Sequence, residues 1–348
     1  MPSLISLLFV LAVLGPVQAI RYLGRVNPAT KELSWSATGV SFTFCGRSAT
    51  IEFEALSGTN SAELIVDGKS TYIADVTGSS IATPANLTQG NHTIIFRKSS
   101  EALYGSIFLG NITTDGTFGP DLSLPGRRIE VIGDSITSGY GIGAALPCTN
   151  TAALEIISET YSVLTAEAVN ADLSIISWSG IGLIRNYASD PVDTSPIMPE
   201  RYTRYGANDP DNSYPFPTAD TPDAIVINLG TNDFGHGNNL RPQLNGSDYT
   251  AAMVKFVQYL KASYKNNAAF FLLTSPMLND GYPEGEMVKT TQRNALNEAV
   301  QQLNGTQAYV VDWPDQGSDV GCDYHPTPNT NEIGAKLLTD AIKGALRW

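Results

Sequence analysis

Basic residues are scarce in this sequence. The 348 residues include 21 Lys and Arg against 34 Asp and Glu, so the formal net charge at pH 7 is −13 and the pI is about 4.6. A protein of this sign is repelled by nucleic acid and by anionic lipid, because both carry negative charge. The composition therefore argues against nucleic acid and membrane partners. A solvated acidic surface suits an extracellular protein.

Long apolar runs are nearly absent as well. The run from Leu4 to Leu14 covers about 11 residues, whereas a helix that spans a bilayer needs about 20. It is followed by Val17-Gln18-Ala19, the small-x-small pattern of a signal-peptide cleavage site. We therefore predict a signal peptide over residues 1–19, a mature chain that begins near Ile20, and a secreted, extracellular protein.

Asn-x-Ser/Thr sequons agree with the secretory route. Such sequons are acceptors for N-glycans in secreted eukaryotic proteins and are expected on the surface. The five candidate glycosylation sites are Asn86, Asn91, Asn111, Asn245 and Asn304.

Cysteine is rare, and its number is odd. Cys148 follows Ser135 closely, and Cys322 precedes His325 by three positions. If both cysteines flank one site, a disulfide between them would tie two distant loops together in an oxidising compartment. Cys45 lies in an alternating apolar segment and is expected to be a buried small hydrophobe.

The N-terminal half, residues 20–114, reads as an all-β sandwich. Short strand-like runs with turn signals between them are typical of antiparallel sandwiches. The Asp67-Gly68 pair is a hairpin signal, because type I′ turns need positive φ at both central residues. The runs are VSFTFC at 40–45, TIEFEA at 50–55, AELIV at 62–66 and HTIIFRK at 92–98. A Gly/Pro-rich stretch at 115–127 is predicted as a linker.

From residue 128 to 348, apolar strands alternate with amphipathic helices. The predicted strands are RIEVIG, LSIISW, AIVINLG, AFFLLT and AYVVDW, with helices near 153–170, from 248, near 286–303 and at the C-terminus. This alternation predicts an α/β domain with a parallel sheet covered on both faces. In such sheets ligands bind beyond the carboxyl ends of the strands.

A serine stands at the end of the first of these strands, in EVIGDSITSGYGIG. A sharp strand-to-helix turn can hold a serine hydroxyl out at the top of a sheet, where it can act as a nucleophile. Ser135 is therefore the candidate nucleophile. The alternative is that Ser135 only caps the following helix.

The sequence has three histidines, which shortens the search for the base that a serine nucleophile needs. His92 lies inside a sequon of the β half and is expected to be exposed. His325 follows the last strand, so it faces the same edge as Ser135, and Asp323 is placed to orient its ring. His236, in GTNDFGHGN, is the rival base.

Acyl transfer also needs hydrogen-bond donors for the developing oxyanion. The backbone amide of Ser135 is one candidate. Gly180 follows the second strand and, lacking a side chain, lets a carbonyl come close. Asn232 follows the third strand and offers a side-chain amide.

These blocks, in this order, resemble the SGNH (GDSL-type) hydrolases. The resemblance rests on Gly133-Asp134-Ser135, Gly180, Gly230-Thr231-Asn232-Asp233 and His325-Pro326. It implies a flavodoxin-like three-layer fold over 128–348, with Ser135, Gly180, Asn232 and His325 in the roles just described. The family pattern has an Asp three residues before the His, where this chain has Cys322. Asp323 is then the expected orienting residue, and a backbone carbonyl is the alternative.

Nearly the whole mature chain resembles carbohydrate esterase family 2. The segments that carry this resemblance are RYLGRVNPATKELSWSATGVSFTF, SWSGIGLIRNY, IMPERY and GCDYHP. It implies a jelly-roll domain before the hydrolase domain and removal of acetyl groups from plant polysaccharides such as xylan and glucomannan. It also implies an aromatic platform at Tyr324, and it supports the pairing of Cys148 with Cys322.

Other aromatic residues are candidates for substrate contacts. Trp178 ends a strand next to Gly180 and is a candidate floor for the acyl pocket, with core packing as the alternative. Tyr140, Phe234 and Tyr282 lie in loops at the rim, where they can contact a sugar face. The segment 186–223 is too long for a plain connection and is predicted to form a wall of the cleft.

We therefore predict a secreted serine esterase that removes O-acetyl groups from xylan or glucomannan through an acyl-enzyme. No metal or cofactor is expected, because no metal motif occurs and GYGIGA lacks the Lys-Ser/Thr ending of a phosphate loop. The expected partner is an acetylated polysaccharide or oligosaccharide, and the expected state is a monomer. The alternatives are a lipase or phospholipase of the same fold, or a non-catalytic carbohydrate-binding protein.

Overall fold

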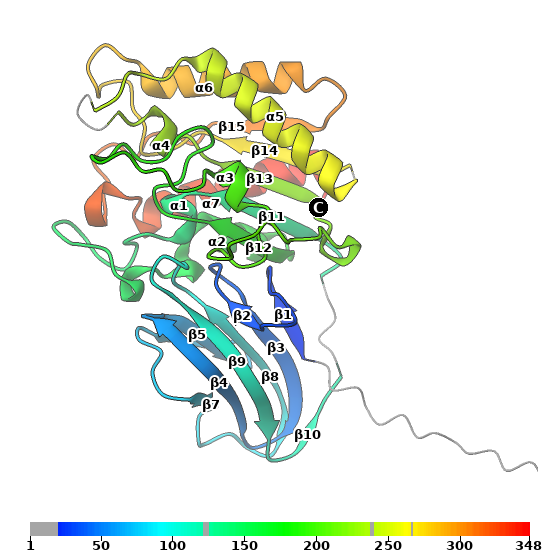
Figure 1. Ribbon diagram of the computed structural model, residues 1–348. Helices are drawn as coiled ribbons and strands as arrows, with labels where there is room; N and C mark the ends of the chain where they lie inside the picture. The colour runs from blue at the N-terminus through cyan, green and yellow to red at the C-terminus, as the bar shows by residue number, and fades with distance from the viewer. Residues whose placement is uncertain (1–19, 121–124, 237–239, 266) are drawn as a thin grey trace, which may run out of the picture.

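Two antiparallel β-sheets pack face to face in the N-terminal half of the chain (Figure 1). The computed structural model describes residues 20–120, 125–236, 240–265 and 267–348, so the predicted signal peptide lies outside the described residues. The first sheet has the order β1-β3-β8-β5-β6, with β10 also paired to β3, and the second has the order β2-β9-β4-β7. The strands are β1 (Arg21–Leu23), β2 (Glu32–Leu33), β3 (Gly39–Gly46), β4 (Ala49–Gly58), β5 (Ala62–Val66), β6 (Lys69–Ile73), β7 (Ser80–Ala82), β8 (Gly90–Lys98), β9 (Gly105–Thr114) and β10 (Thr117–Phe118).

Side chains alternate along these strands, and every second one enters the space between the sheets. Val40, Phe42 and Phe44 of β3 are buried there, as are Ile94 and Phe96 of the neighbouring β8. The opposite sheet contributes apolar side chains from β4 and β9 to the same cluster. The period of two therefore gives the predicted sandwich a single apolar interior.

The predicted hairpin joins β5 to β6. Asp67 and Gly68 have φ of 52° and 78°, and Val66 pairs with Lys69 across the turn. Positive φ at both central residues is the requirement of a type I′ turn, which Asp-Gly meets at low cost.

Strand pairing extends into the segment predicted as a linker. Thr117 pairs with Cys45 and Phe118 with Phe44, and the Phe118 ring lies 5.8 Å from that of Phe42. These residues have apolar partners on β3, and therefore the chain remains part of the sandwich as far as β10.

The C-terminal half contains a parallel sheet of strand order β12-β11-β13-β14-β15. This is the 2-1-3-4-5 order of flavodoxin-like folds, which confirms the predicted architecture. The strands are β11 (Arg128–Gly133), β12 (Asp172–Ser177), β13 (Ala224–Asn228), β14 (Ala269–Leu273) and β15 (Ala308–Val311).

Helices cover both faces of this sheet. On one face, Ile132 of β11 packs in a cluster with residues of α5 and α6, and on the other, Val131 packs with residues of α2 and α7. Among the described residues, no helix is both long and apolar enough to cross a bilayer. The α-helices are α1 (Ser135–Ser138), α2 (Tyr161–Ala168), α3 (Met198–Arg201), α4 (Thr231–Phe234), α5 (Gly246–Tyr264), α6 (Val288–Gln302) and α7 (Pro328–Leu346).

The helix predicted near 153–170 begins later than expected. Two short 3₁₀ turns, Ala152–Leu154 and Ile157–Glu159, precede α2. Thr160 has extended backbone angles, and its hydroxyl accepts from the Val163 amide at 3.5 Å. Because Thr160 caps the helix, the regular hydrogen-bond ladder begins at Tyr161.

The sandwich and the α/β half share buried contacts. Trp35, which follows β2, is fully buried in the same apolar cluster as Ile132, and its indole N–H donates to the Tyr205 carbonyl at 2.7 Å. Arg25, which follows β1, reaches Glu130 of β11 with 3.3 Å between Nη2 and Oε2. Both side chains of this ion pair are almost completely buried, at 1% and 3% exposure. The two halves are therefore joined by a core and by a desolvated charge pair.

Arg25→Ala should lower the free energy of unfolding by about 3–5 kcal/mol, because it leaves the Glu130 carboxylate buried without its cation. Guanidinium chloride unfolding followed by circular dichroism measures this change. The matched control is Arg293→Ala, which breaks the half-exposed pair with Asp312 and should change stability by less than about 1 kcal/mol. Equal, small effects of the two substitutions would contradict a stabilising role for the Arg25–Glu130 pair.

Candidate active site

Ser135 lies in the sharp turn between β11 and α1. A Cβ on Gly133 would lie 2.0 Å from Thr137 Oγ1, so only glycine fits at the end of the strand. Asp134 caps α1, since its Oδ1 accepts from the Ile136 amide at 3.0 Å. Asp134, and not Ser135, is thus the capping residue, which leaves the Ser135 hydroxyl available for other contacts.

His325 is the histidine in contact with Ser135. Its Nε2 lies 2.8 Å from Ser135 Oγ, and its Nδ1 lies 3.0 Å from the backbone oxygen of Asp323. A carbonyl oxygen can only accept, so Nδ1 carries the proton and Nε2 is free to accept from the serine hydroxyl. Burial lowers the pKa of His325 to about 4. The imidazole is therefore neutral, as a base must be, over the physiological pH range.

The expectation that the Asp323 carboxylate orients His325 is wrong, and the alternative of a backbone carbonyl describes the structure. The Asp323 carboxylate accepts from the Tyr140 hydroxyl at 2.9 Å. Asp323 and Tyr324 both have left-handed backbone angles, with φ of 49° and 62°, in the short turn before His325. This turn directs the carbonyl of Asp323, rather than its side chain, at the imidazole.

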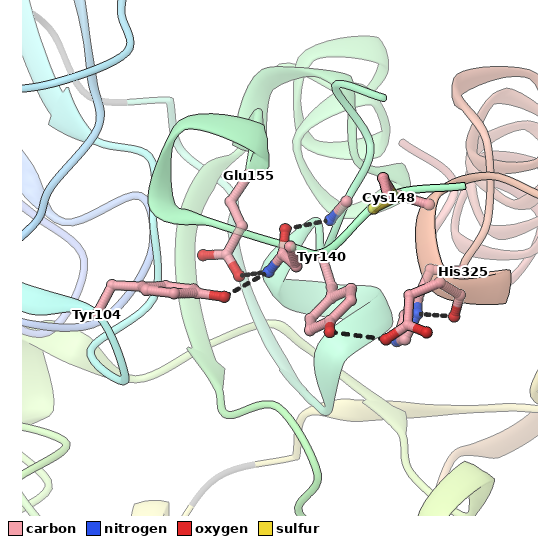
Figure 2. Close-up of a disulfide and its surroundings, with 9 residues drawn as sticks. Tyr104, Tyr140, Cys148, Glu155 and His325 are labelled. Carbon is pink, nitrogen blue, oxygen red and sulfur yellow. Dashed lines mark hydrogen bonds between the residues drawn. A yellow bond between two sulfur atoms is a disulfide. The ribbon is translucent and has the colours of Figure 1, made fainter. Parts of the chain in front are cut away.

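Tyr140 lies against one face of the His325 ring. The two rings are stacked, with centroids 4.0 Å apart and planes inclined by 25° (Figure 2). The sequence predicts Tyr140 as a sugar contact, whereas in the structure its ring lies against the imidazole and its hydroxyl donates to the Asp323 carboxylate. Stacking and hydrogen bond together restrict the rotation of the imidazole.

Gly180 and Asn232 line the same cleft as Ser135 and His325, which has a volume of about 710 Å³. Gly180 has φ of +81°, a conformation that side-chain-bearing residues rarely adopt. Asn232 is 7% exposed, and its Nδ2 donates one hydrogen to the Ile181 carbonyl at 2.8 Å. The second amide hydrogen is available for an oxyanion in the cleft.

Asp233 supports this arrangement, a role that the sequence did not reveal. Its buried carboxylate accepts from three consecutive amides, those of Leu183, Ile184 and Arg185, at 2.9, 2.7 and 3.2 Å. The segment that follows Gly180 is thereby fixed next to Asn232. The position of Asp233 directly after Asn232 in the GTND motif is the one sequence signal that could have indicated such a role.

Cys148 and Cys322 form the predicted disulfide. A Cβ on Gly141 would lie 2.5 Å from Cys322 Cβ, so the loop after Tyr140 packs directly against the bridge. The disulfide therefore joins the loop after Ser135 to the loop before His325. Cys45 is a free thiol and is half-buried.

The predicted aromatic contacts divide into two groups. Tyr324 is 64% exposed at the cleft, and Tyr282, 66% exposed, lines an adjoining groove that shares Tyr324 and Met277 with the cleft. Trp178 instead packs against the core, with the Arg201 guanidinium 3.7 Å from its ring centroid. Phe234 is buried against Tyr249. For Trp178 the structure shows the alternative of core packing rather than a floor of the acyl pocket, and the placement of Phe234 at a sugar face is corrected because its side chain is buried.

The other predicted site residues lie as follows. Residues Tyr187, Ser189 and Asp193 of the predicted wall line the cleft, whereas Tyr202 and Tyr214, later in the same segment, are buried.

His236, the rival base, lies 3.3 Å from Glu286 and is 8% exposed. The asparagines of all five sequons are exposed.

Comparison with known proteins gives two family matches. Residues 22–120 match the carbohydrate esterase 2 N-terminal domain, and residues 129–338 match the GDSL-like lipase/acylhydrolase family. An acetylxylan esterase / glucomannan deacetylase of Cellvibrio japonicus is 34% identical over 90% of this chain and 85% of its own length. Cellulase/esterase CelE of Acetivibrio thermocellus is 30% identical over 94% of this chain, and the chain spans 40% of that longer protein.

Solved structures resemble the whole described chain. A carbohydrate esterase family 2 enzyme plus carbohydrate binding domain from Corynascus thermopiles (Myceliophthora fergusii) has 57% identity and a TM-score of 0.92, over 95% of this chain and 100% of the other. A family two carbohydrate esterase from Clostridium thermocellum, in complex with cellohexaose, has 27% identity and a TM-score of 0.82 over the same shares.

Asp323→Asn should leave kcat/KM for p-nitrophenyl acetate within about threefold of wild type. A threefold change corresponds to less free energy than one hydrogen bond contributes. Asparagine tolerates the left-handed backbone, still accepts from Tyr140, and leaves the carbonyl on His325 in place. Where a carboxylate does hold a catalytic histidine, the same change lowers kcat about 10⁴-fold. A loss of that size here would mean that the carboxylate reaches the imidazole during turnover.

Proposed function

The chain belongs to carbohydrate esterase family 2, with a GDSL-like hydrolase domain, and on this premise we propose that it is a secreted serine esterase that removes O-acetyl groups from plant cell-wall polysaccharides. The observation that carries the proposal is the 2.8 Å contact between Ser135 Oγ and His325 Nε2 in a cleft that also contains Gly180 and Asn232. Nucleophile, base and oxyanion donors are the parts that acyl transfer requires.

In the proposed reaction, His325 Nε2 takes the proton of Ser135 as Oγ bonds to the acetyl carbonyl carbon. The carbonyl oxygen becomes an oxyanion that accepts from the backbone amides of Ser135 and Gly180 and from Asn232 Nδ2. The carbon–oxygen bond to the sugar then breaks, and His325 returns its proton to the sugar oxygen. Water attacks the acetyl-Ser135 ester in the same way, which releases acetate and restores the serine hydroxyl.

The substrate class is supported by the cleft and by the relatives. The cleft is open and continues into a groove with two exposed tyrosines, Tyr324 and Tyr282, and aromatic faces of this kind can stack on sugar rings. The C. japonicus relative is named for acetylxylan and glucomannan, and the C. thermocellum structure contains cellohexaose. We therefore infer that the chain acts on acetylated xylan or glucomannan.

Acetate release from acetylated xylan and glucomannan tests this function. Ser135→Ala and His325→Ala should each lower kcat by at least about 10³-fold, because the nucleophile and its base act as one unit. His236→Ala, the matched histidine control, should retain wild-type activity, since His236 lies against Glu286. Loss of activity in His236→Ala with activity retained in His325→Ala would overturn the assignment of the base.

The same assay separates the rival activities. A p-nitrophenyl ester with a long acyl chain should be hydrolysed poorly compared with the acetate. Turnover of the long-chain ester alone would identify a lipase-like enzyme, and binding of polysaccharide without any turnover would identify a binding protein.

The pH dependence of kcat/KM follows from the neutral state of His325. Burial lowers the pKa of His325 to about 4, so the base is lost by protonation only as the pH falls through that value. An ordinary histidine has a pKa of about 6.5. Activity should therefore persist well below the pH at which an ordinary histidine becomes protonated. Initial rates with p-nitrophenyl acetate between pH 3.5 and 8 measure the acid limb, and reassay at pH 7 after each incubation controls for unfolding. Half-loss of activity near pH 6.5 would contradict the prediction.

A further inference from the structure

We propose that the β-sandwich supplies a positioning residue to the active site, Glu101, whose carboxylate holds the backbone that presents Gly180 to the oxyanion. The inference rests on the proposed esterase function, because it concerns the oxyanion donors of that reaction. On this proposal the N-terminal half contributes a residue that positions the active site of the C-terminal half.

The first observation is a hydrogen bond between the two halves. Glu101 follows β8 of the sandwich and is fully buried. Its Oε2 accepts from the backbone amide of Ser179 at 2.7 Å, across 78 positions of sequence. Ser179 directly precedes Gly180, whose own carbonyl accepts from the Tyr187 amide at 2.7 Å. Glu101 therefore fixes the peptide that directly precedes the Ser179–Gly180 peptide, and Gly180 lines the cleft.

A second chain of contacts leads from Glu101 to the imidazole. The Glu101 amide donates to Glu155 Oε2 at 2.7 Å, and Glu155 Oε1 accepts from Asn150 Nδ2 at 2.9 Å. Asn150 Oδ1 then accepts from the Gly141 amide at 2.8 Å (Figure 2). Gly141 follows Tyr140, which stacks on the His325 ring. The loop around Glu101 is thus linked to both the oxyanion side and the histidine side of the cleft.

The residues at this contact are polar and charged, which favours a role in positioning the backbone over a role in holding the two halves together. Lys98, Glu101 and Glu155 are all fully buried at the junction between the halves. Lys98 Nζ donates to the carbonyls of Ser100 and Glu101, which fixes the shape of the loop. Burial raises the pKa of both glutamates and lowers the pKa of Lys98 to about 8, so all three groups are held at a cost in desolvation. Apolar residues would join the halves at lower cost, but they cannot accept from a backbone amide.

Asp233 holds the other end of the same segment. Its carboxylate accepts from the amides of residues 183–185, while Glu101 accepts from the amide of Ser179. Two carboxyl groups, one from each half of the chain, thereby flank Gly180 along the backbone. Displacement of an oxyanion donor by about 1 Å is enough to cost about 10²-fold in rate.

The test is a series of substitutions at Glu101 in the full secreted chain, with kcat and KM measured on p-nitrophenyl acetate. Glu101→Ala removes the acceptor and should lower kcat about 10²-fold with little change in KM, because the oxyanion exists only after the substrate has bound. Glu101→Gln keeps an oxygen that can accept from Ser179 and should restore kcat to within about fivefold of wild type. Glu101→Asp keeps the charge but shortens the reach and should fall between these two values.

The matched control is Trp35→Phe, which also removes one hydrogen bond between the halves, that from Trp35 to the Tyr205 carbonyl. It should lower the unfolding midpoint and leave kcat unchanged. Wild-type kcat in folded Glu101→Ala would overturn the proposal. A series in which Asp retains activity and Gln loses it would overturn it as well, since charge and not the hydrogen bond would then matter. If Glu101→Ala does not fold, the Gln and Asp variants decide.

A second readout separates this inference from the proposed substrate. A fluorophosphonate probe bonds its phosphorus to Ser135 Oγ with loss of fluoride, the serine proton passes to His325, and the phosphoryl oxygen occupies the position of the oxyanion. Glu101→Ala should be labelled more slowly than wild type, and Trp35→Phe at the wild-type rate. If wild type is labelled but releases no acetate from polysaccharide, the proposed function fails while the labelling comparison still decides the role of Glu101. Equal labelling rates would overturn that role.

Discussion

The hydrogen bond between Ser135 Oγ and His325 Nε2 joins residues 190 positions apart, and much of the surrounding structure serves to keep it in place. The loop after Ser135 contains Tyr140, which stacks on the imidazole, and Gly141, which packs against Cys322. The disulfide from Cys322 to Cys148 returns to that same loop. The proposed nucleophile and the proposed base therefore lie on two segments that are joined by a disulfide and pack against each other.

The same unit depends on the sandwich. Trp35 and Ala102 belong to the apolar cluster on one face of the parallel sheet, and Arg25 is paired with Glu130 on β11, the strand that precedes Ser135. Ions buried in this way each cost several kcal/mol unless hydrogen bonds replace their hydration. Here Arg25 donates to the carbonyls of Tyr202 and Arg204, and Glu130 accepts from the hydroxyls of Tyr202 and Tyr264. Separation of the two halves would expose apolar surface, and it would also remove hydrogen-bond partners from the loops of the hydrolase domain.

The site residues that follow directly from the local sequence pattern could be predicted. Ser135, Gly180 and Asn232 each follow a strand of one parallel sheet, and such strand ends meet at one edge, so their meeting could be inferred without coordinates. The partner of His325 Nδ1 could not, because the left-handed backbone at Asp323 and Tyr324 has no signature in a residue pattern. His92, expected to be exposed, is buried at 7% exposure beside Asp67, since register and not composition pairs its strand with the hairpin. The contact of Glu101 with Ser179 could not be predicted either, because it depends on how the two domains pack together.

The carbonyl partner of His325 has a consequence for where transition-state charge is stabilised. In the proposed reaction an imidazolium forms when the serine proton is taken, and the carbonyl at Nδ1 would stabilise that charge less than a carboxylate would. A larger part of the stabilisation must then come from the oxyanion side, where donors act only if they are fixed before the reaction begins. On the proposed mechanism, the two buried carboxyl groups that accept from amides of residues 179–185, those of Glu101 and Asp233, would serve to fix these donors. The proposal for Glu101 therefore follows from the same carbonyl contact at His325 that distinguishes the proposed base.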